Sequence, residues 1–229
     1  MLDKKKIFME LLVSERIKAL CPELRIGSVW AEVVNCATPD ALWQELEDAA
    51  RQITERYELL QINARPAVAA TRRLYKALGK DPGRYRVASE ALCRRIIRGL
   101  GIYRLTSVVD VINLVSIVSG YPISGLDADK IVGNVLTLGV GEVGEGYCGI
   151  GRGPLNIAGM PVYRDAKGGV ATPTSDEERT QITLGTTHVQ ININAFGEEM
   201  PLADTVAWTV ALLEKYCSAR NITTSIISL

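Results

Sequence analysis

The sequence YRLTSVVDVINLVSIVSGYPISGLDADKI runs from Tyr103 to Ile131 and contains a strongly apolar stretch. Residues 107–119 carry apolar side chains nearly all round a helical wheel, which predicts a buried helix, with a strand as the alternative. Gly120, Tyr121 and Pro122 then interrupt the pattern, because glycine and proline end helices. Beyond them, short strand-like runs are set among glycines. This change of character predicts a mixed α/β (α+β-like) fold and argues against a βαβ repeat.

Helices and strands are predicted on both sides of this stretch. On the N-terminal side we predict strands over residues 6–14 and 24–34, and helices over 16–20, 38–57, 64–78 and 89–98. Thr38 and Ser89 are placed as helix N-caps. On the C-terminal side we predict a helix over 201–216 and strands over 135–138, 155–157, 162–164, 169–171, 187–194 and 222–227. No linker separates these segments, so the chain is expected to form one domain.

The predicted strand over residues 187–194 alternates cleanly. Val189, Ile191 and Ile193 face one side, and His188, Gln190, Asn192 and Asn194 the other, which predicts a half-buried strand. His188 is the only histidine of the chain. A surface or partly buried role is favoured for it, because no partner is identifiable in the sequence. A histidine-ligated metal site is not expected.

The cysteines and the N-terminus bear on the cellular compartment. Five cysteines are widely spaced, without a C-x-x-C pair, which favours reduced thiols in a cytoplasmic protein over a disulfide framework or a zinc site. The lysine run Lys4–Lys6 precedes an apolar segment broken by Glu10, so no signal peptide is predicted. No stretch is long and apolar enough to predict a membrane span, and no cofactor is expected.

Charge is unevenly distributed along a chain whose formal net charge is zero. Residues 65–104 contain eleven lysines and arginines and two acids, a net +9 that the rest of the chain balances. Tyrosines are interleaved with these cations, a combination that suits single-stranded RNA. The alternative is an ordinary solvated helix face. The candidate RNA-binding residues are Arg72, Lys76, Arg94, Arg95 and Arg98.

Two glycine-rich segments are candidate loops. Residues 139–144 match G-x-G-x-x-G, but no helix follows, so a dinucleotide site is not predicted. Residues 149–154 place Arg152 among three glycines, where it could pair with a phosphate or carboxylate, or lie in a simple tight loop. In TPTSDEERT, residues 172–180, Ser175 and Glu178 match a capping box.

The stretch around residues 103–131 also resembles a segment of the β subunit of bacterial phenylalanyl-tRNA synthetase. The matching positions are Val108, Val109, Asp110, Asn113, Gly120, Pro122, Asp127, Lys130 and Ile131. RYR-x-x-SEAL-x-RRI (residues 84–96), IGRGPLN (150–156) and the segment 172–180 are similar to free-standing proteins built around the synthetase's B3/B4 domain. The resemblance covers about residues 72–196. Residues 1–60 and 200–229 would complete a single domain of 1–229.

The resemblance implies a B3/B4 fold with a central mixed or antiparallel sheet and flanking helices. It also implies the aminoacylated 3′ end of tRNA as a partner, with ester hydrolysis as candidate chemistry, since the synthetase module removes tyrosine wrongly attached to the tRNA for phenylalanine. Ser124 stands where that module has a histidine, and Arg152 falls near its glutamate. These exchanges leave open which amino acid is recognised.

We therefore expect binding of the tRNA 3′ end, with deacylation in trans as the candidate activity. The candidate pocket residues are Ser124, Asn113, Arg152, Thr172 and Thr174. If the chain is an enzyme, it is an aminoacyl-tRNA deacylase and not a complete ligase. Two alternatives stay open, a non-catalytic RNA-binding module and a pocket for a free amino acid or small acid. Neither DNA nor a membrane is an expected partner.

Overall fold

The computed structural model describes residues 9–229 of the chain. Its α-helices are α1 (Glu15–Leu20), α2 (Asp40–Arg56), α3 (Pro66–Ala77), α4 (Ala88–Ile97), α5 (Ser107–Ser119) and α6 (Leu202–Cys217). Its strands are β1 (Glu10–Val13), β2 (Arg25–Glu32), β3 (Ile123–Asp127), β4 (Val135–Val140), β5 (Cys148–Gly149), β6 (Gly153–Pro154), β7 (Pro161–Asp165), β8 (Gly168–Ala171), β9 (His188–Ala195) and β10 (Arg220–Ser228). Short 3-10 turns are η1 (Ile62–Ala64), η2 (Ala128–Lys130) and η3 (Glu178–Thr180).

The larger strands form two four-stranded sheets. One has the order β10-β2-β9-β3 and is antiparallel throughout. The other has the order β1-β4-β7-β8, in which β1 and β4 run parallel and the remaining pairs antiparallel. Strands β5 and β6 make a separate small hairpin. The prediction of a mixed α/β fold is confirmed.

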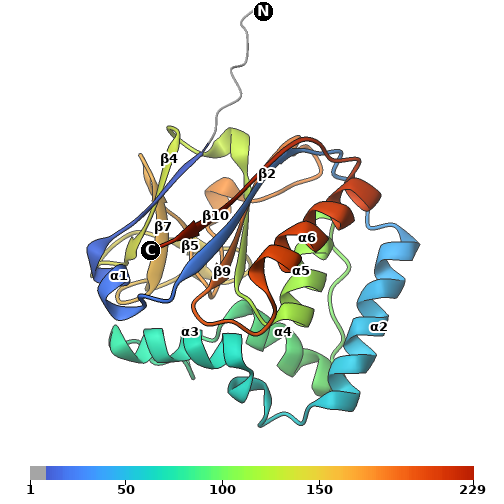
Figure 1. The fold of residues 1–229 in the computed structure, drawn as a ribbon, viewed down its shortest axis with the longest axis horizontal. Coiled ribbons are helices and arrows are strands. Elements are labelled where there is room, and N and C mark those ends of the chain that lie inside the picture. The colour runs from blue at the N-terminus through green and yellow to red at the C-terminus, as the bar shows by residue number, and fades with distance from the viewer. Residues whose placement is uncertain (1–8) are drawn as a thin grey trace, which may run out of the picture.

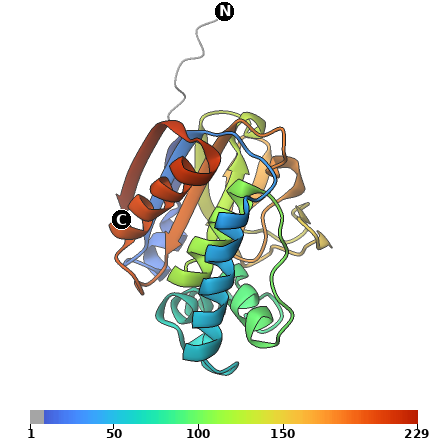
Figure 2. The ribbon, with the colours of Figure 1, turned by 90° about the vertical axis from the view of Figure 1, so that its right-hand side faces the viewer.

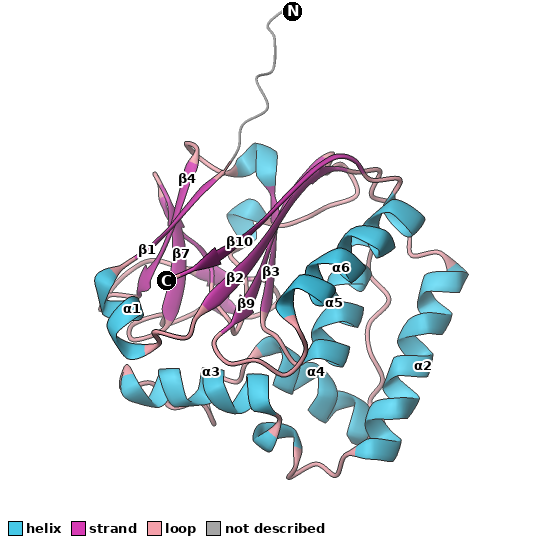
Figure 3. Ribbon diagram, viewed as in Figure 1, coloured by secondary structure: helices cyan, strands magenta, loops and turns pink. Residues whose placement is uncertain are grey.

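The sheets and helices form three layers, seen edge-on in Figures 1 and 3. Helices α2, α5 and α6 cover one face of the β10-β2-β9-β3 sheet, and Figure 2 views the molecule from that helical side. The opposite face of the same sheet packs on the β1-β4-β7-β8 sheet through a second core that includes Ile26, Leu126, Leu138 and Tyr163. Every residue of β9 except His188 is therefore buried. The central sheet is covered on both sides.

Helix α5 is the centre of the helical layer, and its bounds are those predicted. It ends at Gly120, whose φ of 74° is left-handed and favours glycine. The guanidinium of Arg65 caps this end by donating to the carbonyls of Ile117 and Val118 at 2.7 and 2.8 Å. Arg65 is 2% exposed and is neutralised by Glu199 at 2.8 Å. A cation that the sequence assigns to a basic surface is therefore part of the core.

Gly125 lets α5 approach β3 closely. A Cβ built on Gly125 would collide with the Cδ1 of Ile112 on α5. Since successive strand residues point to opposite faces, Ser124 and Leu126 point away from the helices toward the second sheet. Leu126 indeed belongs to the core between the two sheets.

Three predicted caps are wrong: Thr38 and Ser175 have tertiary partners, and the Ser89 hydroxyl is buried without a hydrogen-bond partner among the described residues. Helix α2 begins after Pro39, and the Thr38 hydroxyl instead donates to Asp110 at 2.5 Å. Helix α4 begins at Ala88, which leaves Ser89 buried inside its first turn. The hydroxyl of Ser175 donates to the carbonyl of Ile150 at 3.3 Å, so it forms no capping box with Glu178.

Two predicted strands differ from the structure. Residues 155–157 are not a strand, because the hairpin pairs Cys148 with Pro154 and Ile157 instead packs into a cluster with Tyr75 and Tyr147. The predicted strand over residues 6–14 corresponds to β1, and its residues 6–8 lie outside the described part of the chain, as does the lysine run. Among the described residues, no helix is long and apolar enough to cross a membrane.

Candidate functional site

Ser124 lies on the edge strand β3, opposite Asn192 of β9. It is 3% exposed, and its Oγ is buried without a hydrogen-bond partner among residues 9–229. A buried hydroxyl that makes no bond costs about 1–3 kcal/mol, so such groups are uncommon in folded proteins. The predicted pocket residue is therefore enclosed in the core between the two sheets.

The polar side of β9 surrounds Ser124. The Nε2 of Gln190 donates to the Oγ of Ser28 at 2.8 Å and to the Oδ1 of Asn192 at 2.7 Å. Tyr163, on β7 of the opposite sheet, donates its hydroxyl to the Oδ1 of Asn194 at 2.5 Å. Two further buried atoms, the Oε1 of Gln190 and the Nδ2 of Asn192, make no hydrogen bond with any described residue. The prediction that this side of the strand faces solvent is wrong, because a second sheet covers it.

Asp176 lies against the free edge of β3. Its Oδ2 accepts a hydrogen bond from the backbone N–H of Gly125 at 3.0 Å, and its own carbonyl accepts one from Ile150 at 2.9 Å. Asp176 thus joins the strand of Ser124 to the loop of Arg152. Although part of its surface is exposed, dense surrounding protein raises the pKa of its carboxyl to about 7. In the sequence, Asp176 lies inside an apparent capping motif, and nothing local indicates its proximity to β3.

Thr172 and Thr174 shape the segment that carries Asp176. The Oγ1 of Thr172 accepts hydrogen bonds from the backbone N–H groups of Thr174 and Ser175, at 3.2 and 3.1 Å, and donates to the Ser175 carbonyl at 2.9 Å. The Oγ1 of Thr174 lies 2.9 Å from the hydroxyl of Tyr75, and both residues are buried. These two hydroxyls hold the segment in place, so they are not free to contact a ligand.

Arg152 projects from the tip of the β5–β6 hairpin and is exposed. Its backbone N–H donates to the Gly149 carbonyl at 2.9 Å. The flanking Gly151 and Gly153 have φ values of 67° and 69°, which explains the glycines in this loop. The structure thus connects Arg152 to Ser124 through Ile150, Asp176 and Gly125, with the arginine on the surface and the serine beneath it.

Asn113 is separate from this group. It lies on α5, which covers the helical face of the sheet, whereas Ser124 points to the other face. Its Nδ2 donates to the Oδ1 of Asp110 at 3.4 Å. Asp110 also accepts from the backbone N–H of Leu105 at 3.0 Å. Asn113 therefore belongs to a polar cluster at the start of α5.

The basic segment is only partly available at the surface. Glu90, 1% exposed, accepts a hydrogen bond from Arg72 at 2.8 Å and has Arg94 at 3.9 Å. Arg95 lies over the ring of Tyr103, 4.2 Å from its centroid, and donates to the carbonyl of Leu100. Lys76 and Arg98 are exposed. Of the five predicted RNA-binding residues, Lys76 and Arg98 are the most accessible.

His188 has a partner that the sequence did not reveal. Its Nδ1 lies 2.8 Å from the Oδ2 of Asp129, and its ring stacks on Trp30 with a centroid distance of 5.5 Å. Because Asp127, just before Asp129, pairs with Val189 of β9, the turn after β3 faces His188. Among the described residues, no cluster of three or more histidine, cysteine or acidic side chains is arranged to hold a metal ion.

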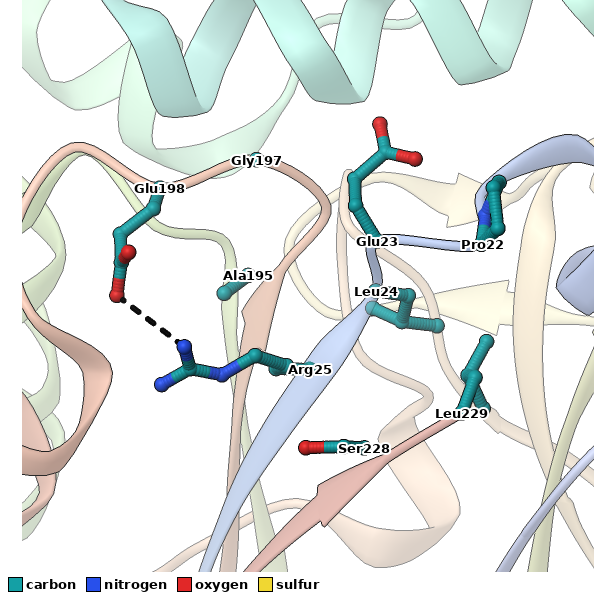
Figure 4. Close-up of a pocket in the computed structure, with 9 residues that line it drawn as sticks. All are labelled: Pro22, Glu23, Leu24, Arg25, Ala195, Gly197, Glu198, Ser228 and Leu229. Atoms are coloured by element: carbon teal, nitrogen blue, oxygen red, sulfur yellow. Dashed lines mark ion pairs between the residues drawn. The ribbon is translucent and has the colours of Figure 1, made fainter.

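Two surface hollows lie away from Ser124. One, of about 370 Å³, is shown in Figure 4, where the Arg25 guanidinium faces Glu198 at 3.6 Å beside the C-terminal residues Ser228 and Leu229. The other, of about 600 Å³, lies between α2 and the residues after α4. Trp43 and Ile96 line it, but so do Glu47 and Glu55, whose charges disfavour phosphate. Neither hollow includes a predicted pocket residue.

Comparison with known proteins gives a family match and similarities to solved structures. Residues 70–202 match the model of a family described as the B3/4 domain. A crystal structure of an N-terminal fragment of the phenylalanyl-tRNA synthetase β-subunit from Pyrococcus horikoshii aligns at 15% identity and a TM-score of 0.45. The alignment covers 96% of this chain and 53% of that one, so the chain spans about half the length of that fragment. No curated protein matches this chain in sequence.

Proposed function

Because this chain belongs to the B3/4 domain family, we propose that it binds the aminoacylated 3′ end of tRNA. The observation that carries the proposal is that the family match, over residues 70–202, contains the whole group formed by Ser124, Asp176 and the Arg152 loop. The resemblance of residues 103–131 to the synthetase β subunit supports RNA as the partner. The acyl group would approach the edge of β3.

Exposed cations of the chain have the chemistry that an aminoacylated RNA end requires. Arg152 is exposed on a glycine loop and could pair with the terminal phosphate, because guanidinium groups bind phosphate through two parallel bonds. Lys76 and Arg98 would interact with more distant phosphates. Arg72 and Arg94, which hold Glu90, would support α3 and α4 beneath them. Arg95 on Tyr103 would offer a cationic ring surface.

Hydrolysis of the aminoacyl ester is the proposed reaction. Such an ester is already activated, so it does not require a histidine base. A water held by backbone groups and assisted by the neighbouring ribose hydroxyl would suffice if the site is preorganised. Ser124 in place of a histidine, and Arg152 near a glutamate position, favour an acyl group other than tyrosine.

The salt dependence of tRNA binding tests the RNA part of the proposal. The affinity for tRNA should fall with KCl concentration, with a log–log slope of about −0.7 per single-strand phosphate contacted. Lys76→Ala and Arg98→Ala should each make the slope about 0.7 less negative. Lys18→Ala, which removes an exposed cation paired with Glu15 on α1, is the matched control and should leave the slope unchanged. A slope near zero for the wild-type chain would instead indicate a small-molecule pocket.

A further inference from the structure

We infer that Asp176 is the residue that accepts a proton from the attacking water at this site. The inference rests on the proposed function and adds to it a side chain with acid–base chemistry. It arises from the position of Asp176 between the edge of β3 and the Arg152 loop, where a backbone bond fixes one carboxylate oxygen. Ser124 lies one residue from that bond.

The two oxygens of Asp176 have different surroundings. Oδ2 is held by the Gly125 N–H at 3.0 Å. Oδ1 accepts no hydrogen bond from any residue in the described part of the chain, and the residue as a whole is partly exposed. One oxygen therefore orients the carboxylate, and the other remains available to a water molecule. A proton acceptor must be within hydrogen-bond reach of the proton it removes, and this arrangement meets the requirement for a water placed at Oδ1.

The other titratable groups nearby are engaged. Glu177 accepts a hydrogen bond from the backbone N–H of Arg179 at 2.6 Å. The hydroxyl of Tyr147 donates to the Ser175 carbonyl at 2.7 Å, and burial together with the charges of Asp176 and Glu177 raises its pKa far above neutrality. Arg152 is a cation and cannot accept a proton, and it lies in the loop whose Ile150 N–H donates to the Asp176 carbonyl. His188, at the start of β9, is paired with Asp129, which lies in the turn after β3.

The protonation equilibrium of Asp176 suits this role. Burial raises the pKa of the carboxyl to about 7, so a large fraction is ionised at neutral pH and its basicity is greater than that of an ordinary aspartate. The negative charge of Glu177 would oppose ionisation, whereas the positive charge of Arg152 would favour it. The ionised form should therefore predominate above pH 7.

The reaction is an ordinary ester hydrolysis. The water oxygen forms a bond to the aminoacyl carbonyl carbon while Asp176 takes one proton from that water. The bond between the carbonyl carbon and the ribose oxygen then breaks, and the proton held by Asp176 passes to the leaving ribose hydroxyl. The products are a free amino acid and tRNA with an intact 3′ end, and Asp176 returns to its ionised state.

Asp176→Asn tests the inference, because the asparagine amide oxygen can still accept the Gly125 N–H. Release of amino acid from a panel of misacylated tRNAs would be followed in single turnovers between pH 5.5 and 8.5, after subtraction of the uncatalysed rate. The wild-type rate should rise about tenfold per pH unit below 7 and level off above it. The variant should be at least about 100-fold slower, as removal of a general base typically causes, with an unchanged affinity for tRNA. Glu178→Gln, which changes an exposed neighbouring carboxylate, should behave as wild type.

Each alternative outcome has a distinct meaning. Hydrolysis by the wild-type chain with an undiminished rate in Asp176→Asn would overturn the role of Asp176 and leave the proposed function intact. A wild-type rate that does not change across pH 7 would also overturn the role of Asp176. This measurement needs only the wild-type chain, so it tests the role even if the variant fails to fold. Binding of the tRNAs without release of any amino acid would overturn the role and leave a binding module. Failure to bind any tRNA would overturn the proposed function as well.

Discussion

Individual charged residues of this chain have environments that the sequence does not reveal. Arg65 and Arg94 belong to the same basic segment as Lys76, yet Arg65 caps a buried helix and Arg94 lies beside a buried glutamate, whereas Lys76 is exposed. Charge counted along the sequence therefore overstates the charge on the surface. The difference is decided by Glu199, which is distant from Arg65 in the sequence, and by Glu90, which is buried one helical turn before Arg94.

Glu90 provides the first test at this scale. Glu90→Gln should lower the free energy of unfolding by about 3 kcal/mol, because it leaves the guanidinium groups of Arg72 and Arg94 without a charged partner in a buried setting. Urea unfolding measures this change. Asp48→Asn, which alters a solvent-exposed pair with Arg51, should change the stability by less than about 1 kcal/mol. Equal effects of the two substitutions would contradict a structural role for Glu90.

Asp176 should make stability depend on pH in an unusual direction. Its folded-state pKa of about 7 lies above the usual value for aspartate, so the folded chain retains a proton that the unfolded chain releases between about pH 4 and 7. This contribution to stability is full below pH 4 and is lost as the pH rises to 7. Asp176→Asn removes the dependence.

The Asn variant should therefore gain stability relative to wild type as the pH rises from 4 to 8. We expect about 1–3 kcal/mol at pH 8, after allowance for the partial exposure of the side chain. Thermal or urea unfolding of both proteins across this pH range measures the difference. A constant difference at all pH values would mean that the carboxyl titrates as it does in the unfolded chain.

At the scale of elements, the contact between α5 and β3 positions the site. Gly125→Ala should lower the free energy of unfolding by about 1–3 kcal/mol, because the new methyl group collides with Ile112 and forces the helix or strand to shift. Chemical denaturation is the appropriate measurement. Gly146→Ala is the matched control, since Gly146 is exposed and no atom lies within 4 Å of the added Cβ. If both variants lost the same free energy of unfolding, the close contact between α5 and β3 would not be needed for stability.

Helix α5 and strand β9 illustrate how far the elements could be predicted. The apolar composition of residues 107–119 favoured a buried helix over a strand, and Gly120 and Pro122 marked its C-terminal end. The alternation of β9 also predicted a strand correctly, but not that Gln190 and Asn192 lie beneath a second sheet. The strands of that second sheet are short and separated in the sequence, so their position depends on tertiary packing.

The arrangement of the candidate site residues depends on tertiary packing in the same way. Ser124 came from family resemblance and Arg152 also from its glycine-rich loop, and hydrogen bonds of Asp176 connect their strand and loop. Asp176 itself was hidden in a segment that resembles a capping box, and only the long-range bond to Gly125 distinguishes it. Asn113 lies on the helical side of the sheet, whereas Ser124 points to the other side. Which side of β3 is covered by α5 cannot be read from the sequence, so this separation could not be predicted. Partners distant in the sequence carry no local signal.

The whole molecule places exposed cations on α3 and after α4, and a polar, buried group between two sheets. This arrangement agrees with a partner that has an anionic backbone and a small polar end. The family match over residues 70–202 includes both features. In our account, the backbone would provide most of the affinity and the esterified amino acid would provide specificity.

The most direct test compares two forms of the same tRNA. One carries its amino acid through a non-hydrolysable 3′ amide, and the other ends in the free 3′ hydroxyl. At a fixed salt concentration, the aminoacylated form of the preferred tRNA should bind about tenfold or more tightly, since contacts with a small side chain and its amine contribute about 1–3 kcal/mol. Equal affinity for the two forms, across a panel of amino acids, would contradict a site for the acylated end.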